Sequence, residues 1–304
     1  MEIKNLKLAV TRAWVHSFGY KRLAFCLSTL ALCIAVTLFF RVLGLGGNRW
    51  VSFFLTLFPC FLSFIFLLGG GVFLIRLYHH EIKGVSFSFK QILWDSKERM
   101  VLSAAYGIPF ALVYIFLAVV LGAFLLFHKI PLLGPLLNPL FTMTVFLVVL
   151  SLFFVLIAVA GILFFLPPLF ALRSDVDKKA IFISCKEKFK RHLFSQLLFF
   201  ISSCAISFCV FFLLMLAYIF TEALFFTSEN LVLNTFSTIF VMVPFAVFLS
   251  PTLAFFFNLA AEAHVWSVLE NEKRDEPPGG EKRDHYLRSP EQVVSQERHA
   301  TKVP

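Results

Sequence analysis

The polar side chains that flank the long apolar stretches are the first candidates for chemistry. His79, His80 and Glu81 follow one apolar run, and Glu262 and His264 close the last one. Adjacent histidines point to different faces of a helix, and neither an HExxH motif nor a spaced cysteine accompanies them to complete a metal site. A membrane-embedded lipid enzyme would have to rely on four of these residues, His79, His80, Glu81 and Glu262. Glu262 and His264 are open to two interpretations: a gate or proton site, or side chains in the headgroup zone where the last helix ends.

Serine and cysteine nucleophiles lack the base that would activate them. Ser202, Ser203 and Ser207 lie in an apolar run without His, Asp or Glu, whereas a nucleophilic serine needs a base within hydrogen-bond reach. The spacing of Ser203 and Ser207 is instead typical of the small-residue face of a packed membrane helix. The six cysteines show no CxxC or metal-ligand spacing. The sequence therefore predicts no catalytic residue, cofactor site or metal site, and no enzymatic activity.

These residues belong to a chain dominated by apolar side chains. Of its 304 residues 59% are apolar and 15% charged, and the mean hydropathy is +0.86, whereas soluble domains carry about 25% charged residues. A bilayer core takes about 20 apolar residues as a helix. Six segments satisfy this requirement and contain no Asp, Glu, Lys, Arg or His: roughly 23–40, 51–75, 101–127, 140–170, 193–220 and 235–261. The sequence predicts an all-α polytopic membrane protein with six transmembrane helices.

The basic residues are distributed unequally between the connecting segments. If the six predicted spans are correct, one side of the membrane receives 24 of the 27 Lys and Arg residues. The positive-inside rule assigns this side to the cytoplasm. We therefore expect a protein of a bacterial inner membrane with both termini in the cytoplasm.

Basic amphipathic segments precede the first, third and fifth spans. The chain is thus predicted to form three units, each an amphipathic cytoplasmic segment followed by a hairpin of two spans. Residues 1–22 form the first such segment, and residues 23–268 hold the six-helix domain. Any duplication would run parallel, about an axis along the membrane normal, but whether the hairpins are true repeats stays open. Residues 269–304 are too polar to build a core, so a disordered cytoplasmic tail is expected.

The segment before the fifth span is the most basic. An apolar stripe with three- and four-residue spacing, including Phe182 and Phe189, predicts a short amphipathic helix in the headgroup zone. The segment is either an ordinary basic loop or a contact site for anionic lipids. The residues that would make such contacts are Lys178, Lys179, Lys186, Lys188, Lys190 and Arg191.

Proline and glycine interrupt several spans. Pro244 and Pro251 stand seven residues apart in the sixth span, where they either shape the bundle or form a gate of the kind that broken helices build in transporters. The triplet Gly69-Gly70-Gly71 lacks the frame of a phosphate-binding loop. Close packing or a local kink is its expected role.

The end of the fourth span and the loop that follows it, LPPLFALRSDVDKKAIFISCKEKFKRHLF, resemble a loose group of bacterial six-span proteins. That group is related to the membrane domain that precedes some glycerophosphodiester phosphodiesterases. Asp175, Asp177, Ala180 and Ser184 match its pattern, while the glycine common in its acidic turn is missing. The resemblance implies a fold and a membrane location but no reaction, because the matching motif is structural.

The sequence favours a non-enzymatic membrane scaffold or accessory protein over a catalyst. Its expected partners are membrane lipids and another membrane protein, since the basic segments contain too little folded mass to bind nucleic acid. The alternative is a permease or channel for a neutral or lipidic solute, because a transporter of ions or acids should carry charge inside its spans. The sequence identifies neither a substrate nor an oligomeric state.

Overall fold

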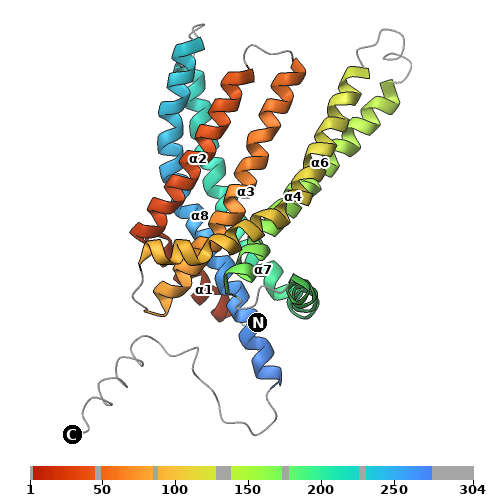
Figure 1. The fold of residues 1–304 in the computed structure, drawn as a ribbon. Coiled ribbons are helices and arrows are strands. Elements are labelled where there is room, and N and C mark those ends of the chain that lie inside the picture. The colour runs from red at the N-terminus through yellow and green to blue at the C-terminus, as the bar shows by residue number, and fades with distance from the viewer. Residues whose placement is uncertain are drawn as a thin grey trace, which may run out of the picture.

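The computed structural model describes residues 3–44, 49–84, 88–127, 138–172, 178–225 and 231–275. This part of the chain is helical and contains no strand. Six of its helices are long and apolar enough to cross a membrane, so the predicted all-α polytopic fold is confirmed. The helices are α1 (Ile3–Ser17), α2 (Tyr20–Gly44), α3 (Arg49–Ile82), α4 (Phe89–Phe127), α6 (Asn138–Leu172), α7 (Lys178–Phe225) and α8 (Leu231–Asp275) (Figure 1).

The helices differ from the predicted spans mainly at their charged ends. The segments expected to precede the third and fifth spans are continuous with those spans in α4 and α7. Neither Gly nor Pro occurs in residues 89–106 or 178–225, so nothing in these segments interrupts the backbone hydrogen bonds. The first part of α4 runs across the other helices before the helix rises (Figure 1). At the other end of the chain, α8 continues to Asp275, six residues beyond the predicted start of the tail.

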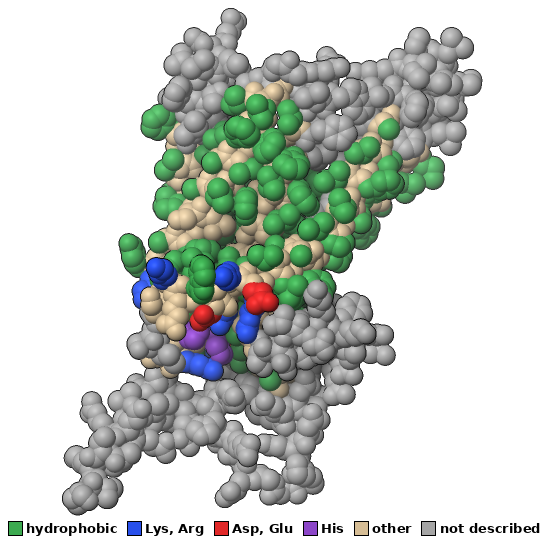
Figure 2. Space-filling model, viewed as in Figure 1, with side chains coloured by type: hydrophobic (Ala, Val, Ile, Leu, Met, Phe, Trp, Pro, Cys, Tyr) green, Lys and Arg blue, Asp and Glu red, His purple; other side chains and the backbone are tan. Residues whose placement is uncertain are grey.

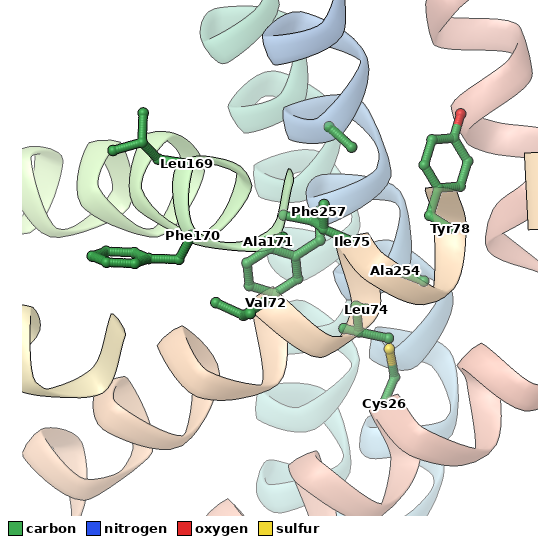
Figure 3. Packing of buried hydrophobic residues seen from close by; sticks show 11 residues of the cluster. Cys26, Val72, Leu74, Ile75, Tyr78, Leu169, Phe170, Ala171, Ala254 and Phe257 are labelled. Carbon is green, nitrogen blue, oxygen red and sulfur yellow. The ribbon is translucent and has the colours of Figure 1, made fainter. Parts of the chain in front are cut away.

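The helix α3 lies at the centre of the packing. Its residues Val72 and Ile75 belong to a buried cluster that also includes Cys26 of α2, Ala171 of α6 and Ala254 of α8 (Figure 3). The helices α2, α6 and α8 therefore meet around the half of α3 that ends at Ile82.

Gly71 lets α3 and α8 approach each other closely. A Cβ atom built on Gly71 would lie 2.3 Å from the Phe257 ring of α8, which is closer than side-chain atoms pack. The expected packing role of the glycine triplet is thus confirmed at this position. Ser203, the proposed small-residue contact on α7, is also fully buried.

The other half of the molecule is open. The hairpin of α4 and α6 leans away from α2, α3, α7 and α8 with increasing distance from the packed end (Figure 1). In its most apolar stretch, α6 has 6% of its residues buried within the protein, compared with 56% for α3. Large apolar side chains in the first half of α6, such as Phe146, Phe153 and Phe154, are therefore available to lipid or to another protein.

The charged side chains gather at the packed end. Figure 2 shows Lys, Arg, Asp, Glu and His side chains at one level, beneath a surface that is largely apolar. The helix α1 and the second half of α8 pack against each other at this level. The same end of the molecule thus carries both the dense packing and the charge.

Candidate functional site

Glu262 links three helices at the charged end. Its carboxylate accepts a hydrogen bond from the Tyr78 hydroxyl of α3 at 2.5 Å and forms an ion pair with Arg12 of α1. The Glu262 side chain is only 7% exposed, whereas that of Arg12 is 42% exposed. A buried carboxylate is tolerated when an opposite charge and hydrogen-bond donors replace its water, and Glu262 has both.

A second ion pair lies beside the first. Arg22, which is completely buried, donates from Nε to Glu81 Oε2 at 3.0 Å and also from Nη2 to the same oxygen. Its guanidinium lies 5.0 Å from the centre of the Tyr78 ring, within the range of a cation–π interaction. His16 Nδ1 lies 3.6 Å from the other Glu81 oxygen. Tyr78 therefore contacts both ion pairs.

Asn258, one helical turn before Glu262 on α8, forms hydrogen bonds to α1. Its side-chain nitrogen donates to the backbone oxygen of Ala13 and to Ser17 Oγ, at 3.2 Å each. The Ser17 hydroxyl in turn donates to the same Ala13 oxygen at 2.6 Å. These bonds hold the end of α1 just before the chain turns into α2. We call seven of the side chains that make these contacts the ionic latch: Arg12, His16, Arg22, Tyr78, Glu81, Asn258 and Glu262.

The charges of the latch are matched to one another. Burial lowers the pKa of Arg12, but the hydrogen bond and the negative charge of Glu262 outweigh burial, so the pKa lies above its usual range. Arg12 therefore stays protonated, and both oxygens of Glu262 have donors. No group of three or more His, Cys, Asp and Glu side chains that could hold a metal ion occurs among the described residues. The contacts of the latch are those of a structural tie between helices.

The histidine and glutamate candidates from the sequence do not form a single site. Glu262 and Glu81 enter the latch, while His79 and His80 lie in the last turn of α3. The His264 backbone oxygen accepts a bond from Ser267 at 2.7 Å. The headgroup interpretation of Glu262 missed Arg12 and Tyr78 as its partners.

The predicted lipid-contact residues lie in the first turns of α7, from Lys178 onward. The helix is present there, but the side chains of residues 178–193 lie outside the described part of the structure. Asp175 and Asp177 of the resembling motif, and the tail from residue 276, also lie outside it. The lipid-contact prediction therefore stays a prediction.

The two prolines of the sixth span lie beside residues that line a cleft. Both are inside α8, and Phe245, Ala246 and Leu249 between them face α2 across a cavity of ≈ 190 Å³. The cavity walls are almost entirely apolar. The structure thus associates the predicted gate or kink segment with an apolar cleft and not with the ionic latch.

Comparison with known proteins leaves the resemblance to the phosphodiesterase membrane domain a prediction. No family model, curated protein or solved structure matches this chain.

Proposed function

We propose that this protein is a non-enzymatic membrane scaffold whose α4–α6 hairpin receives a transmembrane helix of a partner protein. The observation that carries the proposal is the contrast between a locked end and an open hairpin. The ionic latch and the cluster around α3 fix one end of the bundle, while the first half of α6 exposes a row of large apolar side chains.

The uncovered surface of α6 suits a helical partner. Phe153, Phe154 and Ile157 are each about 60% exposed, and Gly161 has open space where a Cβ atom would be, with no atom within 4 Å. Small residues let two helices approach closely in a membrane, and large flanking side chains then supply the packing. The opposite side of α6, with Val159 and Ile162, packs on α3.

The latch supports a structural role for the charged residues. A pump or ion-coupled carrier needs an ionisable group that can exchange its partner, whereas Glu262 and Arg22 each have partners on neighbouring helices. In this way the latch would hold the packed end of the bundle rigid, and the scaffold would present α6 to the partner. Both termini are expected on the cytoplasmic side of a bacterial inner membrane, following the charge distribution of the connecting segments.

Site-specific photocrosslinking in cells tests the proposal. A photoreactive residue at Ile157 of α6 should yield one discrete protein adduct, and the same residue at Phe208, which is 69% exposed on α7, should not. Gly161→Leu should abolish the adduct, while Ala35→Leu, which places the same side chain at an exposed position of α2, should leave it unchanged. Crosslinking only to lipid from Ile157 would contradict the proposal.

The cleft between α2 and α8 favours a second candidate function, a permease for a lipidic solute. Three of its four lining residues on α8 lie between Pro244 and Pro251, where rearrangement of α8 could open a path. Transport into proteoliposomes by wild-type protein, and its loss in Pro244→Ala or Pro251→Ala, would favour this function. A protein that travels with a stoichiometric companion in native mass spectrometry favours the scaffold.

A further inference from the structure

The cleft between α2 and α8 has the length of one membrane leaflet. On α2 its lining begins at Leu30 and ends at Arg41, which corresponds to about 16 Å along a helix that rises 1.5 Å per residue. The hydrocarbon core of a bilayer is about 30 Å thick. Since Arg41 lies in the last turn of α2, far from the latch, the cleft runs from the middle of the membrane to the surface opposite α1.

The cleft is apolar along its length and carries a single cation at its mouth. Its walls include Ile34 and Leu38 of α2 and Phe245 and Leu249 of α8. The one hydroxyl among the lining side chains, that of Thr37, already donates to the Cys33 backbone oxygen at 2.8 Å. Arg41 is exposed and has no hydrogen-bond or ion-pair partner among the residues that the structure describes.

The volume of the cleft limits what it can hold. An apolar cavity of about 150 Å³ accommodates benzene, and pockets for whole drug-sized ligands span about 300–1,000 Å³. At ≈ 190 Å³ the cleft accommodates a segment of a hydrocarbon chain and is too small for a bulky solute. A long, narrow, apolar space with a positive charge at one end is complementary to a molecule with an acyl chain and an anionic head.

We propose that this cleft is a binding site for an anionic glycerophospholipid of the leaflet opposite α1. One acyl chain lies between α2 and α8, and Arg41 binds the phosphate at the membrane surface. The site is independent of the proposed scaffold function, because the lipid occupies α2 and α8 whereas the partner is assigned to α6. The competing explanation is that Arg41 only extends to the bulk headgroups, as arginines near helix ends do.

Native mass spectrometry of the full-length protein in mild detergent distinguishes the two explanations. The protein is titrated with phosphatidylglycerol and, separately, with phosphatidylcholine of the same acyl chains. Arg41→Gln removes the cation, and its matched control is Lys90→Gln, an exposed residue at the latch end of the molecule. Ala246→Phe fills the cleft, and its control is Ala35→Phe on an exposed position of α2.

The site predicts one saturable phosphatidylglycerol adduct on the wild-type protein. Arg41→Gln should weaken it about fivefold, the factor that one basic residue contributes at a lipid surface, and Ala246→Phe should weaken it at least about tenfold. Both controls should bind as the wild type does. Equal binding of phosphatidylcholine, or an Arg41→Gln protein that titrates like Lys90→Gln, would overturn the proposal. This comparison stands even if Ala246→Phe fails to fold, since Arg41 and Lys90 are both exposed.

Discussion

Removing Arg12 should destabilise the protein more than neutralising the carboxylate that Arg12 contacts. Arg12→Ala leaves the charge of Glu262 buried, with only the Tyr78 hydroxyl as a donor. Loss of one partner from a buried ion pair costs about 3–5 kcal/mol. The Arg12 side chain is 42% exposed, so water screens part of the interaction and lowers this cost. We expect a decrease in the free energy of unfolding of about 2–3 kcal/mol.

The double variant carries the decisive comparison. Glu262→Gln removes the charge but keeps an oxygen that can accept the Tyr78 hydrogen bond, so we expect a cost of about 1 kcal/mol. Because no charge is then left without a partner, Arg12→Ala with Glu262→Gln should be about 1–2 kcal/mol more stable than Arg12→Ala alone. The stability of the double variant thus separates a buried charge from a loss of contacts.

Unfolding by increasing mole fractions of SDS in detergent micelles measures these differences. Tryptophan fluorescence is a suitable signal, because Trp14 of α1 packs edge-on against Phe255 of α8, with the ring centres 5.5 Å apart. Unfolding separates the two rings. Lys7→Ala is the matched control, since Lys7 is an exposed cation on the same helix, and it should change stability by less than about 0.5 kcal/mol. The reasoning is refuted if Arg12→Ala is as stable as Lys7→Ala, or if the double variant is less stable than Arg12→Ala.

Three further perturbations test the packing and the topology. Gly71→Ala should lower the free energy of unfolding by about 1–3 kcal/mol, because the new methyl group meets the Phe257 ring. Gly161→Ala, whose methyl group meets open space, should not destabilise the protein. Equal SDS midpoints of the two variants would contradict this prediction. Asn258→Ala should lower the free energy of unfolding by about 1–2 kcal/mol, because it removes two hydrogen bonds to the end of α1. Proteolysis within α1 should become faster. An unchanged rate of proteolysis would argue against Asn258 holding α1 on α8. A periplasm-sensitive reporter fused after Asn230 should be active, and activity of the same reporter at the C-terminus would contradict the expected orientation.

Hydropathy was sufficient to locate the membrane helices but not to define their packing. Each predicted span overlaps one of the six long apolar helices, because a span excludes charge over about 20 residues and this signal is local. Glu262 and Arg12 are 250 residues apart in sequence, and no local pattern connects them. Arg22 was counted as a contribution to the positive-inside rule, yet its side chain is completely buried. A charge bias along a chain does not distinguish a residue that faces the headgroups from one that pairs inside the bundle.

The separation into a packed end and an open hairpin follows from how helices associate in lipid. Lipid chains are as apolar as leucine, so association depends on close packing at small residues and on polar contacts. The second half of α8 has both, since Ala254, Ala260 and Ala261 are buried together with Asn258 and Glu262.

The first half of α6 has bulky apolar side chains instead, and Phe146, Phe153 and Phe154 each remain more than 60% exposed. These side chains have no preference for α2 or α7 over an acyl chain, and α6 therefore separates from the bundle. The alanine-rich run at the end of the sixth span is the sequence signal from which the packed end could have been predicted. On the same argument, the open hairpin gains contacts only from a partner with small residues of its own, which is why Gly161 on α6 is the position where a partner helix is expected to cross.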